Sequence, residues 1–391
     1  MTLSLASEVA NVADYLPASP AAASPAGPPA AAVAPVAAEV AGDDTRSVLE
    51  YVERRGFHFA PWQVASYITA IRTKPFVILA GVSGTGKSAL PRLVAEATGA
   101  IATTVPVRPD WNDSSELLGY KSLTGDFEPG HLLRFAREAK ANPDMQYFFL
   151  LDEMNIARPE YYFAEVLSRI EETGVLLDPA GATPLKPEAG AEWGSIAMPA
   201  NLAVVGSVNM DETTFGFSRK VLDRAFVIEF SEVDLSLIGQ GELAARPRAW
   251  HSDAWRRESA TLFHHPRSTE PSVIRVVETL SELNAVLKLA QLHFGYRVRD
   301  EVAMFVLAAE RSPDQFESAE GGQIDPLDLA ISMKVLPRIQ GSGVVISNLL
   351  RQLAEWAQPS DGAGSAFPVC AQRIDLMQRR LVETGFTNYW T

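Results

Sequence analysis

Residues 81–88 read Gly-Val-Ser-Gly-Thr-Gly-Lys-Ser, a spacing of glycines, lysine and serine that suits the binding of phosphate groups. Glycines in such a loop let successive backbone N–H groups turn inward toward phosphate oxygens. The ammonium group of Lys87 would reach the β and γ phosphates, and the Ser88 hydroxyl would join the coordination shell of a Mg²⁺ ion. The predicted nucleotide-binding residues of the loop are Gly81, Val82, Ser83, Gly84, Thr85, Gly86, Lys87 and Ser88. Pro91 is expected to kink the start of the helix that follows.

Two adjacent carboxylates, Asp152 and Glu153, directly follow the apolar run 147–151. Such a run is typical of a buried strand, and ligands bind at the carboxyl ends of strands in open α/β sheets. We expect Asp152 to hold the metal, directly or through water, and Glu153 to polarise an attacking water as general base. Nucleoside kinases need no water-activating acid, so the pair favours hydrolysis of a nucleoside triphosphate.

Asn209 follows another apolar run, 202–208. Its short polar side chain would help to orient the attacking water from a neighbouring strand. The structural alternative is an ordinary turn residue, but the order of the motifs favours the catalytic role.

Arginines occur at two further positions where they could reach a phosphate. Arg224, with Arg219 as the less favoured candidate, precedes the last strand candidate and would stabilise transition-state charge on the nucleotide of a neighbouring subunit. Arg297, with Arg299 as its rival, opens a helix and would contact phosphates from the C-terminal side. An ion pair with a nearby acid is the alternative for each of them.

Five short apolar runs predict strands, at 76–80, 101–107, 147–151, 202–208 and 226–230. Helical or loop segments separate them, which is typical of a parallel sheet with helices on both faces. Beyond Phe230 the apolar residues follow a helical period instead. One stripe consists of Val273, Val276, Val277, Leu280, Leu283 and Leu287, and a second of Val302, Phe305, Val306 and Ala309.

Composition and pattern divide the chain into four parts. Residues 1–44 are rich in Ala, Pro and Ser and predict a disordered arm. Residues 45–232 are expected to form the α/β domain with its N-terminal helices, 233–270 a connecting segment, and 271–391 a helical domain.

The bulk composition restricts the class of protein. The 391 residues include 48 acidic and 34 basic side chains, which give a formal net charge of −14. This charge argues against a surface that binds nucleic acid along its whole length, but it is compatible with a local basic pore. The single cysteine, Cys370, excludes an intramolecular disulfide. Without a membrane-length apolar run or a signal peptide, the chain is expected to be soluble and cytoplasmic, with no membrane partner.

These elements, in this order, resemble AAA+ ATPases, and more closely their McrB-like branch, the NTP-hydrolysing subunits of modification-dependent restriction systems. Residues 81–88 correspond to Walker A and 147–153 to Walker B. The segments that carry the closer likeness are 152–155, 163–166, 208–214, 220–224, 294–297, 334–341 and 385–390, so the resemblance covers about residues 45–391.

The resemblance implies a P-loop αβα sandwich with a five-stranded parallel sheet and a C-terminal α-helical lid. It also implies ATP hydrolysis with Mg²⁺ between the subunits of a homo-oligomeric ring, expected to be a hexamer. ATP is favoured as the nucleotide, and GTP is the alternative, since the contacts to the base, expected near Gly56, Phe57 and Phe59, cannot be read from periodicity. Residues 107–112 and 117–120 would belong to a loop facing the central pore, and 176–198 to an inserted hairpin.

The departures from the McrB pattern also bear on function. The chain shows no domain for reading methylated DNA and no nuclease constellation, so DNA cleavage would need a separately encoded, McrC-like nuclease. A MoxR-like chaperone that remodels proteins is the alternative function, because it shares all the catalytic residues. A nucleotide-gated scaffold that barely hydrolyses is disfavoured by the presence of Glu153, Asn209 and Arg224.

Overall fold

The computed structural model describes residues 44–171, 176, 193–209, 215–231, 235, 246–257, 261–358 and 366–390. Outside this range lie the predicted arm up to residue 43, most of the predicted hairpin 176–198, and residues 210–214 of the segment that includes Asn209. All of the described residues belong to one compact unit, Ala38–Thr391.

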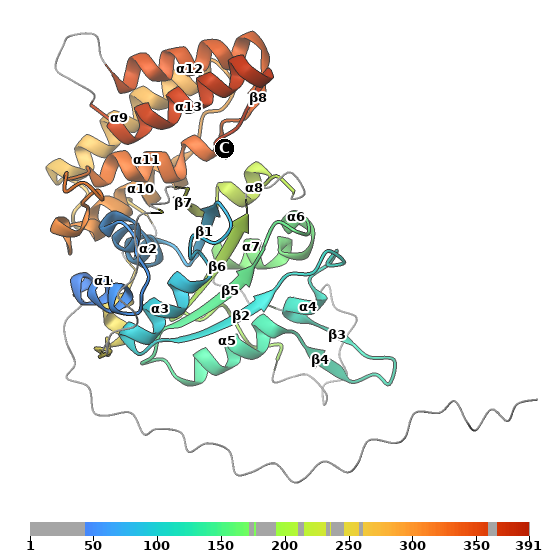
Figure 1. Ribbon diagram of the computed structural model, residues 1–391. Helices are drawn as coiled ribbons and strands as arrows, with labels where there is room; N and C mark the ends of the chain where they lie inside the picture. The colour runs from blue at the N-terminus through green and yellow to red at the C-terminus, as the bar shows by residue number, and fades with distance from the viewer. Residues whose placement is uncertain are drawn as a thin grey trace, which may run out of the picture. The chain divides into compact units, whose positions relative to one another are not determined.

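A parallel sheet of five strands forms the centre of the molecule, in the order β2-β5-β6-β1-β7 (Figure 1). Its strands are β1 (Phe76–Gly81), β2 (Ile101–Pro106), β5 (Tyr147–Asp152), β6 (Leu202–Asn209) and β7 (Phe226–Phe230). The five predicted strands and the α/β fold class are thereby confirmed. All six residues of β1 are buried, which explains why the strand is apolar throughout rather than alternating.

The strand register brings the predicted chemical groups to one edge of the sheet. Gly81 pairs with Asn209 on one side of β1, and Asp152 pairs with Pro106 at the end of β5. Because all five strands are parallel, their carboxyl ends lie together. The loop after β1 and the polar residues after β5 and β6 therefore meet at this edge.

Helices α1 to α8 precede the sheet strands or lie between them along the chain. They are α1 (Thr45–Arg54), α2 (Pro61–Thr73), α3 (Ala89–Thr98), α4 (Ser115–Leu118), α5 (His131–Ala141), α6 (Pro159–Tyr162), α7 (Ala164–Glu171) and α8 (Arg219–Leu222). α2 packs against β1, α3 against β2 and β5, and α5 against β5. Since α3 begins at Ala89, Pro91 lies in its first turn, where the backbone N–H has no helical acceptor. Pro91 therefore removes no hydrogen bond that the helix would otherwise make.

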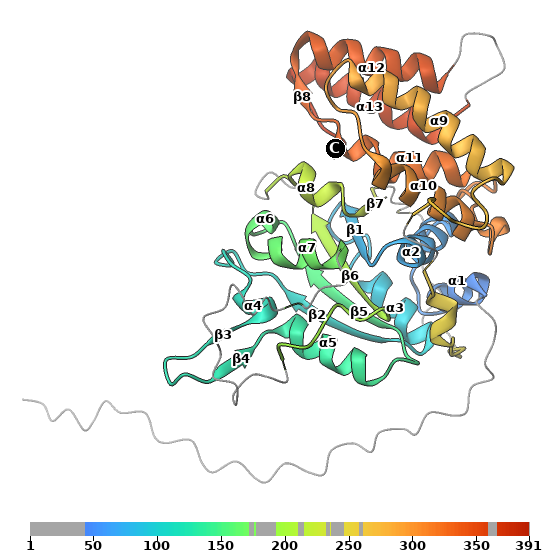
Figure 2. The ribbon, with the colours of Figure 1, turned by 180° about the vertical axis from the view of Figure 1, so that it is seen from behind.

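The C-terminal part is helical, as predicted. It contains α9 (Pro271–Lys288), α10 (Tyr296–Ala309), α11 (Pro326–Lys334), α12 (Gly343–Ala357) and α13 (Pro368–Thr384), with a small ladder between β8 (Gly341–Ser342) and β9 (Phe386–Thr387). Figures 1 and 2 show α10 next to α2 and α11 next to β7, and each of these two pairs is in contact. In α9 the predicted stripe is buried except for the half-buried Val277.

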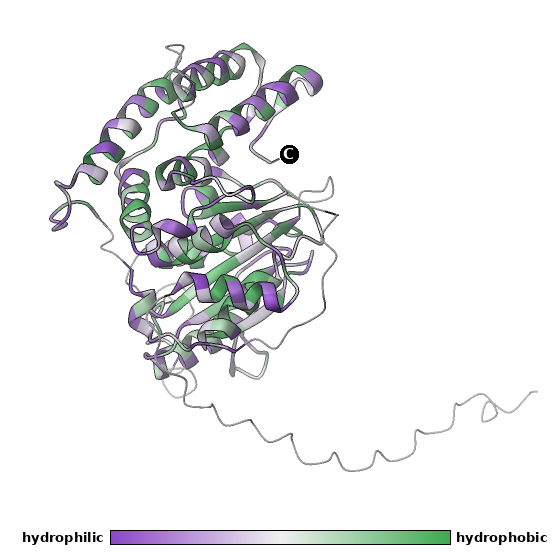
Figure 3. Cartoon of the chain, turned by 60° about the vertical axis from the view of Figure 1, so that its left-hand side comes forward, coloured by the Kyte–Doolittle hydropathy of each residue, from purple (hydrophilic) through white to green (hydrophobic). Residues whose placement is uncertain are grey.

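Hydropathy follows this layered arrangement. In Figure 3 the strands of the sheet are mainly apolar, whereas apolar and polar residues alternate along the helices. An amphipathic helix buries one stripe and solvates the other, and a strand covered on both faces has no solvated side. None of the helices within the described ranges is both long and apolar enough to span a bilayer.

A short hairpin that the sequence did not suggest follows β2. Its strands are β3 (Gly119–Lys121) and β4 (Phe127–Pro129), between α4 and α5. It includes the end of the segment expected to face a pore. Trp111 from the same segment is buried against the Tyr162 ring, with 5.3 Å between centroids, so packing within the chain accounts for this aromatic side chain.

Candidate functional site

The predicted phosphate-binding loop, residues 81–88, connects β1 to α3, as the motif requires. Gly84 and Gly86 have φ angles of 84° and 86°, which L side chains rarely adopt. At Gly86 a Cβ atom would also lie 2.9 Å from the Phe59 ring, which packs beneath the loop. Both properties explain why the motif needs glycine at these positions.

Lys87 lies across the loop with only 4% of its surface exposed. Its Nζ donates to the carbonyl oxygens of Gly81 at 3.0 Å and Val82 at 2.5 Å. Burial lowers the pKa of Lys87 to about 8, and the nearby Asp152 opposes that shift. The ammonium group therefore lies within the loop, held by two of its carbonyls, and is weakly solvated, which strengthens its attraction for an anion.

The Asp152 carboxylate joins three strands. Its Oδ1 accepts hydrogen bonds from Ser88 Oγ at 2.5 Å and from Ser207 Oγ at 2.6 Å. Ser88 follows β1 and Asp152 ends β5, and these strands are separated in the sheet by β6, which carries Ser207. Ser207 therefore lies between the two predicted metal-binding groups and holds the carboxylate from the middle strand.

Glu153 and Asn209 are also brought together. Asn209 Nδ2 donates to Glu153 Oε1 at 3.1 Å, and the backbone N–H of Glu153 donates to Ser207 Oγ at 3.0 Å. Glu153 has a φ of 54°, a left-handed conformation that costs a non-glycine residue about 1 kcal/mol or more. A further bond from Asn155 Nδ2 to the Asn209 carbonyl, at 3.1 Å, ties the turn after β5 to the end of β6.

The donor set at this edge suits Mg²⁺. The ion prefers oxygen ligands and commonly uses one or two protein groups together with phosphate and water oxygens. Ser88 and Asp152 offer a hydroxyl and a carboxylate 2.5 Å apart, so these two residues would hold the ion. The part of the chain that the structure describes contains no cluster of three or more His, Cys, Asp or Glu side chains that would bind a metal without a nucleotide.

Arg224 lies far from the loop of its own chain. It belongs to the turn between α8 and β7, and its Nη1 donates to the Lys220 carbonyl at 3.0 Å. Phe226 pairs with Val77, so this turn lies at the amino end of β1. The six residues of β1 span about 20 Å to the loop at its other end. Arg224 therefore cannot reach a nucleotide held by its own chain.

Arg297 lies on the same side. Burial lowers the pKa of Lys74, just before β1, and repulsion from Arg297 and Arg224 contributes to the shift, while the carboxylate of Glu301 opposes it. Arg297 therefore lies within electrostatic range of the amino end of β1. Its helix, α10, packs on α2.

Each of the two rival arginines has a charged neighbour. Arg299 Nε and Nη2 donate to Asp300 Oδ1 at 2.8 and 2.6 Å, and its guanidinium lies 5.0 Å from the Tyr296 ring. Arg219 repels Arg338, whose pKa is lowered chiefly by burial. The ion-pair alternative therefore describes Arg299 well.

Sequence reasoning missed two kinds of residue. Ser207 received no role, although the two-residue period of a strand places it on the same face as Asn209. Lys334 and Arg338 were noticed only as part of a motif, yet both contact the turn that carries Arg224. Nothing in the helical period of α11 indicates that contact.

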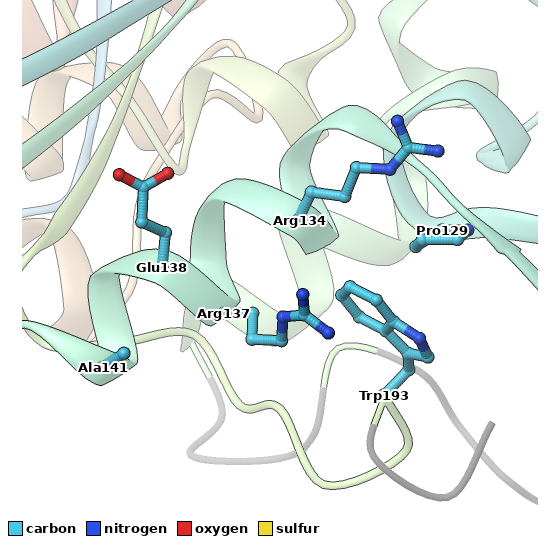
Figure 4. Close-up of a pocket in the computed structure, with 6 residues that line it drawn as sticks. All are labelled: Pro129, Arg134, Arg137, Glu138, Ala141 and Trp193. Carbon is cyan, nitrogen blue, oxygen red and sulfur yellow. The ribbon is translucent and has the colours of Figure 1, made fainter.

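Away from this edge, a pocket of about 460 Å³ lies beside α5 (Figure 4). Arg137 covers the Trp193 ring there, with its guanidinium 4.0 Å from the ring centroid. The pocket is lined by Pro129, Arg134, Arg137, Glu138, Ala141 and Trp193. None of the residues predicted to bind nucleotide or metal belongs to it.

Two family models match the chain. Residues 76–227 match an AAA domain (dynein-related subfamily), and residues 252–386 match a domain of unknown function (DUF8727). No curated protein matches the chain. Among solved structures, a "putative ATPase" from Cytophaga hutchinsonii is 16% identical with a TM-score of 0.46, over 75% of this chain and 87% of that one.

The first match and the geometry describe the same part of the chain. Residues 76–227 include β1, β2, β5 and β6 in full, the loop 81–88, and the carboxylates and asparagine that meet beside it. The sheet domain of this chain therefore has an α/β P-loop fold that is similar to AAA domains over residues 76–227, and it is joined to a helical C-terminal region.

Proposed function

We propose that the chain is an AAA+ ATPase that binds ATP and Mg²⁺ at the 81–88 loop and hydrolyses the γ-phosphate between the subunits of a ring. The observation that carries this proposal is one continuous set of hydrogen bonds. It runs from Ser88 through Asp152 and Ser207 to Glu153 and Asn209. A phosphate site with no hydrolytic task would not need a glutamate fixed beside the metal-binding aspartate.

Each group has a distinct role in this proposal. The loop N–H groups and Lys87 bind the phosphates, and Ser88 and Asp152 hold Mg²⁺, which neutralises charge on the β and γ phosphates. Asn209 fixes Glu153 Oε1 by a hydrogen bond, so Oε2 is left to accept the proton of the attacking water. The strained turn at Glu153 is held by Ser207 and keeps the base in place.

The position of Arg224 supports hydrolysis between subunits. The arginine lies at the opposite end of β1 from the loop, so it would complete the site of a neighbour and stabilise transition-state charge there. Arg297 lies on the same side and would also serve the neighbour. A closed ring, with six subunits as our specific proposal, gives every loop one such neighbour.

For the biological task we propose a McrB-like motor that acts on DNA together with a separately encoded, McrC-like nuclease. The support is the resemblance of segments 152–155, 334–341 and 385–390 to that branch. A MoxR-like chaperone uses the same hydrolytic site, and the net charge of −14 suits a protein substrate as well as it suits a narrow DNA-binding pore.

The decisive experiment measures phosphate release from ATP and from GTP, with and without Mg²⁺ and double-stranded DNA, while light scattering follows the mass. We expect Mg²⁺-dependent turnover that prefers ATP, assembly on nucleotide binding, and faster turnover with DNA. Turnover that ignores DNA would favour the chaperone over the restriction motor. No turnover with either nucleotide would overturn the hydrolytic proposal itself.

A further inference from the structure

The turn that carries Arg224 is held by a lysine from the helical region. Lys334 ends α11, and its side chain is fully buried. Its Nζ donates to the Asp223 carbonyl at 2.9 Å and to the Ala225 carbonyl at 3.0 Å. These are the two carbonyls on either side of Arg224, so one ammonium group fixes the backbone from which the arginine projects.

The charge of Lys334 is compensated locally. Glu301 Oε2 lies 2.5 Å from Lys334 Nζ, and the ammonium lies 5.1 Å from the centroid of the Phe226 ring. The other oxygen of Glu301 pairs with Lys74, just before β1. Burying an ion costs free energy unless such partners replace water. The presence of a buried lysine at this position therefore points to a role for its two contacts with backbone carbonyls.

Arg338 holds the same turn through its side chain. Its Nε lies 2.7 Å from Asp223 Oδ1, and only 9% of the arginine side chain is exposed. Backbone and side chain of Asp223 are thus both bound by residues of the helical region. Glu301 and Arg297 are four residues apart on α10, so they share one helix face.

Resting on the hydrolysis proposed above, we propose that Lys334 and Arg338 are positioning residues for Arg224. They act through the 223–225 turn of their own subunit on the nucleotide site of the next one. The helical region thereby controls a neighbour's site, and any shift of α11 relative to β7 moves Arg224.

The test assigns each variant to one side of the subunit interface. Lys334→Met should lower kcat by about 100-fold, the effect of displacing a catalytic group by roughly 1 Å, and should leave ATP affinity unchanged. Mixed with Glu153→Gln subunits, it should recover activity, because some interfaces then pair an intact Glu153 with a well-placed Arg224. Mixed with Arg224→Ala subunits it should recover none, since every arginine is missing or displaced.

The opposite pairing would overturn the inference. If Lys334→Met recovers with Arg224→Ala and not with Glu153→Gln, the lysine serves the site of its own subunit. Recovery in both mixtures or in neither, while Glu153→Gln and Arg224→Ala rescue each other, also contradicts a role through Arg224. If those two reference variants fail to rescue each other, the proposed interface itself is wrong.

Two further sets of variants guard against misfolding. Arg338→Gln and Asp223→Asn remove the same ion pair from opposite partners, leave Lys334 in place, and should show the same mixing pattern. Arg338→Lys should restore part of the activity. Lys140→Met is the matched control, because Lys140 also donates to a backbone carbonyl, that of Ser195 at 3.2 Å, but from an exposed position on α5. It should leave kcat unchanged.

Discussion

The Ser207 hydroxyl binds Asp152 and Glu153 at once. Its Oγ donates to Asp152 Oδ1 at 2.6 Å and accepts the N–H of Glu153 at 3.0 Å. One small side chain on β6 therefore fixes both the proposed metal ligand and the backbone of the proposed base.

Ser207→Ala should reduce hydrolysis more than nucleotide binding. Loss of the hydroxyl leaves the strained Glu153 N–H without its acceptor and removes one of the two hydroxyl donors to Asp152 Oδ1. We expect kcat to fall about 10- to 100-fold, with ATP affinity within a few-fold and unfolding free energy lower by about 1–2 kcal/mol. Steady-state kinetics and urea unfolding measure these effects.

Ser66→Ala is the matched control for that substitution. Ser66 is equally buried, and its hydroxyl makes no hydrogen bond within the described structure. The control should retain full activity. An equal loss of kcat in both variants would show that the Ser207 effect is a general consequence of repacking.

Glu153→Gln should bind ATP and assemble normally while turnover falls by about 100- to 10,000-fold, because an amide cannot accept the water proton. The amide still offers an oxygen to Asn209, so the turn should keep its shape. Light scattering in ATP should show a persistent assembly, and Glu165→Gln, an exposed change on α7, should behave as wild type. Surviving hydrolysis in the Glu153 variant would remove the glutamate from the role of base.

Local sequence patterns were sufficient to predict the five strands of the sheet and the loop at residues 81–88. Each strand is a short apolar run, and residues 81–88 carry their conformational requirement in their own glycines. The meeting of Asp152 and Asn209 then follows because parallel strands end at one edge. For these features the periodicity of the sequence and the topology of a parallel sheet decide the outcome.

Contacts between distant segments could not be predicted in this way. Lys334 and Asp223 are 111 residues apart, and the spacing of α11 indicates a buried face without naming what it meets. Arg297 opens a helix, but its position in space depends on the packing of α10 on α2, which the sequence does not indicate. Trp111 stands in a polar segment, and its burial depends on Tyr162.

Asp328 is expected to be essential for the stability of the helical region. Its buried carboxylate accepts the backbone N–H groups of Val369 at 2.7 Å and Cys370 at 3.0 Å, in the first turn of α13. Asp328→Ala orphans both donors and should lower the free energy of unfolding by about 2–4 kcal/mol, and Asp328→Asn by less. Urea denaturation measures the loss.

Asp375→Ala provides the comparison on the same helix. Among the described residues Asp375 pairs only with Arg379, on the exposed face of α13, so its removal should change stability by less than about 0.5 kcal/mol. Equal losses for both aspartates would contradict the proposed capping of α13 by Asp328.

Lys87 should make stability depend on pH in a direction that its burial fixes. Its pKa is lowered from 10.5 to about 8 in the folded chain, so between these values the unfolded chain binds more protons than the folded one. The free energy of unfolding of the wild type, minus that of Lys87→Met, should therefore rise with pH from about 8 to 10.5, by at most about 1.4 kcal/mol per unit. Lys334 also has a pKa of about 8, but it is present in both proteins and cancels in the difference. Urea unfolding of the two proteins at pH 7.5 and 9.5, without nucleotide, measures the quantity. A difference that stays constant would mean that Lys87 is solvated like a surface lysine, and its weak solvation could then contribute nothing to phosphate binding.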